Sequence, residues 1–403
     1  MEEWKEFKAK DFCTSVTDGT NDSPKPKSFG HYLITSKHLK DNRIDYSTAN
    51  LISEEDYQKV IQRSAVEQYD ILFSMIGTIG NVVQVKLEQV DFAVKNMGIF
   101  KMGKEPLKSY WLYYWLKSDF SKEYINQRLA GSTQSYLTLD SLRNYPILYP
   151  GDHLANKIIS ILKSLDDKIE NNRKINENLE QQAQALFKSW FVDFEPFRDQ
   201  PFVESELGMI PEGWRVENLD NLCSFISRGL SPKYKDNTDQ WVLGQTCVRN
   251  NIVTLTNART HEPKANTEKK VKQWDTLINS TGIGSLGRVG IVYFDKDNIA
   301  FDSHLTVVRT KDELYKHYIG RNLLMRQLEI ENMAIGSTGQ TELPKESVKT
   351  MQLIVPDKAS VQRFNKFIEP IALRMYQTYD ENNNLSHLRD TLLPKLMSGE
   401  IKL

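Results

Sequence analysis

The sequence contains little cysteine. Its three cysteines, Cys13, Cys223 and Cys247, lie far apart in the 403 residues and form no CxxC pair. Because zinc knuckles and disulfide frameworks need closely spaced cysteines, we expect neither. A run of about 18 apolar residues is also missing, as is an apolar stretch near the N-terminus. We therefore expect a cytoplasmic protein that has no membrane partner.

An excess of one charge is missing as well. Lys and Arg together number 52, and Asp and Glu together number 53. This balance argues against a strongly basic, histone-like binder. It leaves room for a local basic patch that binds nucleic acid, because such binding depends on a patch and not on the total charge. The balance also indicates that affinity for a nucleic acid is shared with a partner protein.

Motifs of intrinsic catalysis are absent too. No two prolines are adjacent, so the chain lacks the Asn/Asp-Pro-Pro-Tyr motif with which an amino-methyltransferase holds a flipped base. Residues 98–105, GIFKMGKE, fit the phosphate-binding pattern GxxxxGK, but Glu105 stands where Ser or Thr binds Mg²⁺. The seven histidines are scattered without metal-ligand spacing. We expect a non-catalytic protein with no metal site and no intrinsic cofactor.

One stretch, residues 153–194, contains neither glycine nor proline. Apolar residues recur in it at alternating steps of four and three, which predicts a long helix with a coiled-coil seam. The expected seam positions include two asparagines, which fix register at a cost in stability. These positions are Ile158, Leu162, Leu165, Ile169, Asn172, Asn176, Leu179 and Leu186.

A matching seam recurs about 206 residues later, near the C-terminus. Its positions are Phe364, Ile368, Ile371, Met375, Asn382, Leu385 and Leu392. Two matching amphipathic segments in one chain favour an intramolecular helix pair. The alternative is that each is a core helix of its own domain.

The repeat extends beyond the helices. Three landmark residues recur in order 210 positions later, Trp4, Cys13 and Gly19 as Trp214, Cys223 and Gly229. LFSMIGTIGNV at 72–82 parallels LINSTGIGSLGRV at 277–289, and GSTQSYL at 131–137 parallels GSTGQTEL at 336–343. Ordered matches of this kind indicate an internal duplication.

Each half contains both strand-like and helix-like runs, which predicts the α+β class. We expect two similar globular domains and two long antiparallel coiled-coil helices, related by a pseudo-two-fold axis that reverses one helix. The expected boundaries are 1–151 for the first globular domain, 152–195 for the central helix, 196–210 for a linker, 211–357 for the second globular domain and 358–403 for the C-terminal helix.

Three motifs together resemble a known family. They are LEQQAQALFKSWFVDFEPF at the end of the central helix, LRDTLLPKLMSGEIKL at the C-terminus, and GSTGQTEL before an apolar strand. With the duplicated layout, the chain resembles the specificity subunit of type I restriction-modification systems over nearly its whole length. The first half departs from the pattern, because GSTQSYL lacks the second glycine.

The resemblance implies two target-recognition domains, each reading one half of a bipartite, asymmetric site in double-stranded DNA. It implies that the helix pair sets the gap between the half-sites and docks two methyltransferase subunits, to which restriction subunits are added. S-adenosylmethionine, ATP and Mg²⁺ are then expected on those partner subunits and not on this chain.

Candidate DNA contacts follow from residue type. Arg reads guanine edges, Asn or Gln reads adenine edges, and Lys mostly meets phosphate. In the first half the candidates are Lys25, Lys27, His31, Lys37 and Gln134, and in the second half they are Arg228, Lys233, Tyr234, Lys235, Arg249, Asn250, Asn251 and Gln340. The alternative for each charged residue is a solvated surface charge.

Two other functions stay open from the sequence. The chain could be a coiled-coil scaffold whose globular regions bind protein and not DNA. It could also be a nucleotide-dependent enzyme that uses the loop of Lys104.

Overall fold

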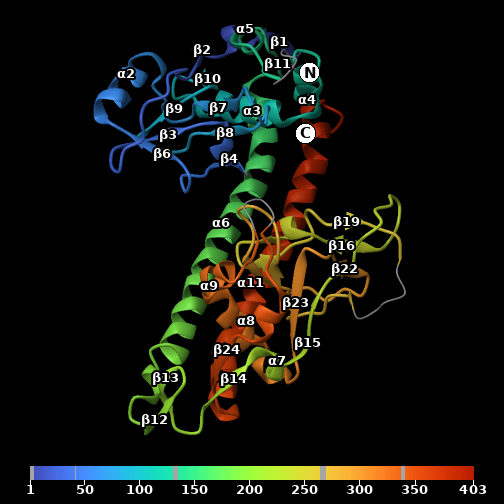
Figure 1. Cartoon of the computed structure of the whole chain (residues 1–403). Coiled ribbons are helices and arrows are strands. Elements are labelled where there is room, and N and C mark those ends of the chain that lie inside the picture. Colours follow the sequence, from blue (N-terminus) through green and yellow to red (C-terminus); the bar gives the residue numbers. More distant parts are fainter. Residues whose placement is uncertain (1–3, 41, 130–134, 264–268, 337–340) are drawn as a thin grey trace. The chain divides into compact units, whose positions relative to one another are not determined.

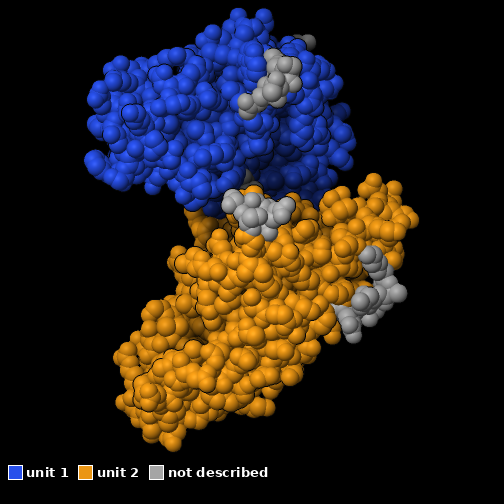
Figure 2. Space-filling model, in the orientation of Figure 1, with its two compact units in different colours: residues 1–169, 383–403 blue, residues 170–382 orange. Residues whose placement is uncertain are grey.

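The computed structural model describes residues 4–40, 42–129, 135–263, 269–336 and 341–403. The chain divides into two compact units (Figure 2): unit 1 comprises Met1–Ile169 and Asn383–Leu403, and unit 2 comprises Glu170–Asn382. Each unit combines helices and sheets (Figure 1), so the predicted α+β class is confirmed. None of the described helices is both long and apolar enough to cross a membrane.

The strands of unit 1 are β1 (Lys5–Lys8), β2 (Ser15–Asp18), β3 (His31–Ile34), β4 (Leu39–Lys40), β5 (Arg43–Ile44), β6 (Asn50–Ile52), β7 (Ile71–Ser74), β8 (Val82–Gln84), β9 (Phe92–Val94), β10 (Met97–Lys101) and β11 (Pro146–Tyr149). Its shorter helices are α1 (Ala9–Phe12), η1 (Ser36–His38), α2 (Glu54–Ser64), α3 (Pro106–Lys117), α4 (Asp119–Asn126) and α5 (Leu139–Arg143). Two long helices, α6 (Asp152–Phe191) and α11 (Lys358–Met397), contribute to both units.

The strands of unit 2 are β12 (Phe202–Ser205), β13 (Gly208–Pro211), β14 (Arg215–Asn218), β15 (Cys223–Arg228), β16 (Trp241–Leu243), β17 (Val248–Arg249), β18 (Ile252–Val253), β19 (Arg259–Thr260), β20 (Thr276–Asn279), β21 (Val289–Ile291), β22 (Ile299–Phe301), β23 (Leu305–Thr310) and β24 (Gln352–Val355). Its shorter helices are η2 (Glu195–Phe197), α7 (Leu219–Leu222), η3 (Gln245–Cys247), η5 (Glu313–Tyr315), α8 (Lys316–Met325), α9 (Gln327–Asn332) and α10 (Lys345–Lys349).

The two units repeat one topology. Unit 1 has a sheet in the order β2-β10-β7-β8, and unit 2 has the same order in β15-β23-β20-β21, extended by β18 and β17. In the second sheet of each unit, β3 lies between β6 and β9 as β16 lies between β19 and β22. The pairing of β1 with β11 likewise recurs as β14 with β24. The predicted internal duplication is therefore confirmed in the order and pairing of the elements.

Some elements differ between the units within the described part of the chain. Helix α2 belongs to unit 1, and the hairpin of β12 and β13 belongs to unit 2. The hairpin lies in the segment that the sequence analysis treated as a linker loop. Gly208, with φ of 96°, lies at the tight end of the hairpin, where glycine is favoured.

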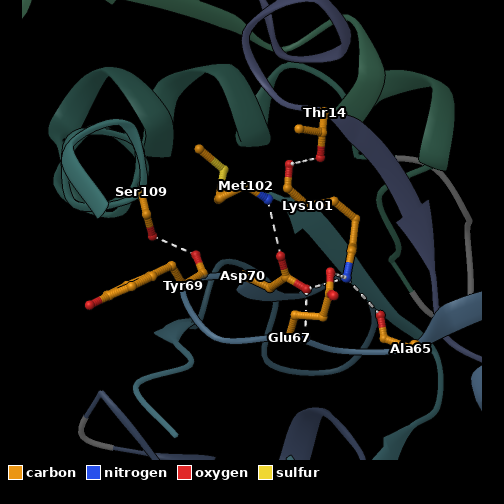
Figure 3. A network of polar contacts seen from close by, with 8 residues as sticks. All are labelled: Thr14, Ala65, Glu67, Tyr69, Asp70, Lys101, Met102 and Ser109. Atoms are coloured by element: carbon orange, nitrogen blue, oxygen red, sulfur yellow. Dashed lines mark hydrogen bonds and ion pairs between the residues drawn. The ribbon is translucent and has the colours of Figure 1, made fainter. Parts of the chain in front are cut away.

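A buried carboxylate ties two neighbouring strands of unit 1 together (Figure 3). Asp70 precedes β7, and its fully buried side chain accepts hydrogen bonds from Lys101 Nζ at 2.6 Å and from the Met102 N–H at 3.0 Å. Lys101 Nζ also donates to the carbonyl oxygen of Ala65 at 3.0 Å and to the Glu67 carboxylate at 2.8 Å. A buried charge is tolerated when it is paired and hydrogen-bonded in this way.

Unit 2 repeats this arrangement with arginine in place of lysine. Asp275 precedes β20 and accepts from Arg309 Nε at 2.8 Å and from Arg309 Nη2 at 2.6 Å. Arg309 Nη2 also donates to the carbonyl oxygen of Lys270 at 2.8 Å, as Lys101 does to Ala65. The common scaffold thus extends to individual side-chain hydrogen bonds.

The long helices pair antiparallel within each unit. In unit 1, Arg389 Nη1 of α11 donates to Asp166 Oδ1 of α6 at 2.7 Å. In unit 2, Asn172 Nδ2 of α6 donates to Asn382 Oδ1 of α11 at 3.0 Å, and the rings of Phe191 and Phe364 lie 4.8 Å apart. Residue numbers rise along α6 as those of their partners fall along α11. The predicted antiparallel pair is confirmed, and two unpaired core helices are excluded.

Burial along the two helices follows the expected seam with local differences. Ile158, Leu162, Ile169, Asn172, Phe364, Ile368 and Met375 are buried, whereas Leu165, Asn176, Leu179, Leu186, Ile371, Asn382, Leu385 and Leu392 are half-buried. Phe187 is buried next to Leu186, and Ala372 is buried next to Ile371. The core-facing position therefore shifts by one residue at these two places.

The ends of the long helices pack against tryptophans that are equivalent in the repeat. In unit 1, Trp4 shares a core with Leu396 and Met397 at the end of α11 and lies against Gly399. In unit 2, Trp214 packs on Phe191 at the end of α6, with ring centroids 5.9 Å apart. The C-terminal segment and the N-terminal segment thus meet in unit 1.

Candidate nucleic-acid interface

Each unit presents a glycine turn between two strands of its main sheet. We define the glycine turns as residues 75–81, between β7 and β8, and 280–288, between β20 and β21. Beside each turn runs the segment after the GST motif, because the Leu137 N–H donates to Met75 O at 2.9 Å and the Leu343 N–H donates to Ser280 O at 2.8 Å. Glycine is required at Gly287, where φ is 82° and a Cβ would lie 2.9 Å from the backbone of Glu331.

The glycine turn of unit 2 is two residues longer than that of unit 1. Gly77 and Gly80 match Gly284 and Gly287, so Gly282 and Ile283 are additional. Ile283 is 89% exposed and stands between two glycines in left-handed conformations. An apolar side chain so fully exposed at the tip of a turn contributes nothing to the packing of the hydrophobic core.

A cluster of polar side chains surrounds the glycine turn of unit 2. The Gln245 amide donates to the Thr281 hydroxyl, which lies 2.8 Å from His304 Nδ1. Close by, Arg228 Nη1 pairs with Glu342 Oε1 at 2.7 Å, and Thr281 forms a β-bridge to Glu342. This arrangement presents donors and acceptors from four separate elements around one turn.

The equivalent positions of unit 1 have different chemistry. Ile76 replaces Thr281 and Tyr136 replaces Glu342 in the corresponding β-bridge. Asp18 replaces Arg228 in the strand register and pairs with Arg63 of α2 at 2.5 Å. The two units therefore share a scaffold but differ around the glycine turn.

The lysine candidates of unit 1 lie at the surface, but His31 has another role. Lys25, Lys27 and Lys37 are exposed. His31 is stacked on Tyr57 of α2 with 3.9 Å between ring centroids, and it bonds Glu54 Oε2 at 2.5 Å and the Asp91 carboxylate. Burial opposes protonation, but the hydrogen bonds to these two carboxylates raise the pKa of His31 above its usual range. His31 therefore helps to hold α2 against β3, and its contact with DNA stays a prediction.

In unit 2 the exposed candidates lie before β16 and at the β17–β18 turn. Lys233, Tyr234 and Lys235 are exposed, and the Arg259 guanidinium lies 3.4 Å from the Tyr234 ring centroid. Stacking of this kind holds an aromatic face and a positive charge together at the surface.

At the β17–β18 turn, Arg249 and Asn250 point outward and are exposed, whereas Asn251 is half-buried. Asn251 Nδ2 donates to Glu180 Oε1 of α6 at 2.8 Å. Arg228, as described above, is engaged with Glu342 and with the carbonyl oxygen of Leu343. Arg228 and Asn251 thus hold the fold in addition to lying near the candidate interface. Gln134 and Gln340 lie outside the described residues.

The GxxxxGK-like segment does not form a phosphate-binding loop. Gly98 lies inside β10, paired with Phe73 of β7, and a Cβ there would meet Leu142 Cδ1 at 2.3 Å. A loop that wraps phosphate needs free backbone N–H groups between the two glycines, but residues 99–101 belong to β10 and the Met102 N–H donates to Asp70 Oδ1. The nucleotide-binding interpretation of Lys104 is therefore wrong.

Residues 1–181 match the family model described as "Type I restriction modification DNA specificity domain". The chain is 29% identical over 315 residues to the type I restriction enzyme MjaIX specificity subunit of Methanocaldococcus jannaschii, covering 74% of this chain and 71% of that protein. It is 23% identical to the type I restriction enzyme HindI specificity subunit of Haemophilus influenzae, over 100% of both chains. The chain is thus similar to specificity subunits of type I restriction-modification systems.

The fold of this chain is also found in a solved structure. The crystal structure of a type I restriction-modification system S subunit from M. genitalium aligns with a TM-score of 0.57 at 16% identity, covering 98% of this chain and 96% of that chain. The sequence analysis did not single out Gln245, Thr281 and His304, because no local pattern in the sequence brings these three residues together.

Proposed function

We propose that this chain is a specificity subunit that recognises double-stranded DNA for a type I restriction-modification complex, with unit 1 reading one half of a bipartite, asymmetric site and unit 2 reading the other. The observation that carries the proposal is the contrast between a repeated scaffold and divergent glycine turns. Asp70 with Lys101 and Asp275 with Arg309 hold equivalent strands in the same way. The side chains around the turns differ in polarity and charge. Two units that share one scaffold but carry different contact residues would recognise two half-sites of different sequence.

The exposed basic residues supply the phosphate contacts in this proposal. Lys25, Lys27 and Lys37 serve unit 1, and Lys233 and Lys235 serve unit 2. Such contacts fix position on the duplex without reading sequence. Because the chain as a whole is nearly neutral, we infer that tight binding requires further contacts from partner subunits.

The partners are inferred from the family. We propose that the helix pair of α6 and α11 docks two methyltransferase subunits, and that restriction subunits join them. S-adenosylmethionine, ATP and Mg²⁺ then act on those subunits, and this chain contributes recognition without catalysis. Exposed apolar side chains on the long helices, such as Ile175, Phe367, Leu373 and Leu388, are compatible with such docking.

Mapping of DNA methylation tests the proposal. Genomic DNA from a host that carries this gene with its methyltransferase gene is compared with DNA from the same host without this gene. We expect methylation at one two-part sequence motif that requires this chain. Footprinting of the purified complex should protect both parts of that motif. A scaffold that binds only protein would leave the methylation pattern and the DNA protection unchanged by its removal.

A further inference from the structure

Both carboxylate oxygens of Glu180, on α6, bond to the globular part of unit 2. Glu180 Oε1 accepts from Asn251 Nδ2 at 2.8 Å, and Glu180 Oε2 accepts from Arg321 Nη1 at 2.5 Å. The side chains of Glu180 and Arg321 are only 15% and 2% exposed. An ion pair so well shielded from solvent is much more costly to break than a surface pair, so it fixes the positions of both side chains.

Arg321 depends on this contact. It lies on α8, where Nη2 reaches the Tyr293 hydroxyl at 3.2 Å. Because a buried guanidinium without a counter-ion is strongly unfavourable, Arg321 holds the Glu180 carboxylate in place. The second carboxylate oxygen is then presented in a fixed position to Asn251.

Asn251 belongs to the tight turn that joins β17 and β18. Asn250 and Asn251 both have positive φ, 52° and 65°, as a two-residue hairpin turn of the type I′ geometry requires. Asn251 Oδ1 also accepts a hydrogen bond from Gln327 Nε2 of α9 at 3.3 Å. The backbone carbonyl oxygen of Asn251 accepts from the Ile291 N–H at 3.2 Å. The inward residue of the turn is thus held by α6, α9 and β21.

The outward residues of the same turn are Arg249 and Asn250, and both are exposed. Arg and Asn are the side chains that read guanine and adenine edges. We infer that Glu180 is a positioning residue for DNA recognition: through Asn251 it fixes the β17–β18 turn, so that Arg249 and Asn250 meet the DNA in one orientation. This inference rests on the proposed function and assigns part of the recognition by unit 2 to a residue of the helix pair.

Unit 1 uses its helix carboxylate differently. Tyr114 occupies the place of Arg321, and its hydroxyl donates to Asp166 Oδ2 of α6 at 2.9 Å. Asn42, the equivalent of Asn251 in the β4–β5 turn, is exposed. We therefore expect the contact between α6 and the β17–β18 turn to affect recognition of the unit 2 half-site and not of the unit 1 half-site.

The direct test is Asn251→Gly, since glycine accepts the positive φ and removes only the side-chain amide, which bonds Glu180 and Gln327. Asn42→Gly is the matched control in unit 1. The full chain is assembled with its methyltransferase subunits, and dissociation constants are measured for the mapped site and for duplexes with either half-site scrambled. We expect Asn251→Gly to lower the discrimination against a scrambled unit 2 half-site by about tenfold, comparable to the loss of one base contact. Discrimination at the other half-site should be unchanged, and Asn42→Gly should not reproduce the loss.

A double-mutant cycle separates positioning from general loosening of the fold. If Asn251 acts by orienting Arg249, then Arg249→Ala should cost much less in the Asn251→Gly background than in the unaltered chain. Equal cost in both backgrounds, or equal loss at both half-sites, would overturn the inference. Unchanged discrimination by Asn251→Gly would also overturn it while leaving the proposed function intact. The proposed function itself fails if the unaltered complex prefers no sequence.

Discussion

Arg309 occupies in unit 2 the position that Lys101 occupies in unit 1. Each side chain donates a hydrogen bond to a buried aspartate that precedes the neighbouring strand. The distance is 2.6 Å from Lys101 Nζ to Asp70 Oδ2 and 2.6 Å from Arg309 Nη2 to Asp275 Oδ2. The guanidinium meets both oxygens of Asp275, whereas the ammonium meets one oxygen of Asp70 and leaves the other to a backbone N–H. The duplication has therefore retained a charge at this position and not a particular residue, because the buried carboxylate requires a cation.

Replacing Arg309 should destabilise unit 2 strongly. Arg309→Ala leaves Asp275 buried without its counter-ion, and we expect a loss of about 3 kcal/mol or more in the free energy of unfolding. Urea unfolding followed by fluorescence measures this loss. Arg309→Lys is the matched control, since unit 1 shows lysine working at the same place, and it should retain most of the stability. Similar stability of the alanine and lysine variants would contradict the prediction.

Ile283 should contribute to binding and not to stability. Because the side chain is 89% exposed, Ile283→Asn should change the free energy of unfolding by no more than about 0.5 kcal/mol. If Ile283 makes an apolar contact with a base, for example with a thymine methyl group, affinity for the intact site should fall by about tenfold, or about 1.4 kcal/mol. Titration of the labelled duplex with the assembled complex measures the affinity.

Met209→Asn is the control for this experiment. Met209 is 55% exposed on β13, in the hairpin with β12, and the substitution should leave affinity unchanged. Equal losses for the two variants would show that a reduction in exposed apolar surface, and not the place of Ile283, is responsible.

His317 makes the stability of unit 2 depend on pH. Burial, together with nearby Lys316 and Arg321, lowers the pKa of His317 to about 3. The unfolded chain takes up this proton near the ordinary pKa of about 6.5, so the stability due to the neutral ring is present above that pH and is lost as the pH falls towards 3. We expect a loss of about 1.4 kcal/mol per pH unit in this window from this one group. His317→Gln should flatten that part of the profile, as measured by urea unfolding between pH 4 and pH 7.

The duplication was predictable because its landmark residues have defined packing partners. Trp214 Nε1 donates to Asp357 Oδ2 at 3.0 Å, and Trp4 packs on Trp111 with 5.8 Å between ring centroids. Large side chains in fixed surroundings persist in both copies and keep their spacing. The helix pair was predictable for a related reason, since a heptad pattern requires a partner surface.

The interface was less predictable, because its contacts join residues far apart in the chain. His31 was expected to meet DNA, but its partners Glu54 and Asp91 lie 23 and 60 residues away in sequence. Gln245 and His304 likewise converge on Thr281 only when three elements fold together. No local periodicity signals such clusters, whereas seam residues and glycine turns carry a local pattern.

The length of the helix pair should set the spacing of the DNA site. We propose this because α6 contributes residues to both units and its register with α11 is fixed by polar contacts such as Asn172 with Asn382. Inserting one heptad into α6 and one into α11 at paired positions preserves the seam and lengthens each helix by about 10 Å, since each residue adds about 1.5 Å.

At about 3.4 Å per base pair, the mapped site of the lengthened chain should have a spacer about three base pairs longer. The two half-sequences of the site should be unchanged, because the insertions leave the glycine turns and the β17–β18 turn unaltered. Methylation mapping in the host reads out both properties at once. Insertion of a heptad into α6 alone is the control: it leaves seam residues of α6 without partners on α11 and should lower the yield of folded protein. A lengthened pair that folds but methylates the original spacing would mean that the gap is set elsewhere in the complex.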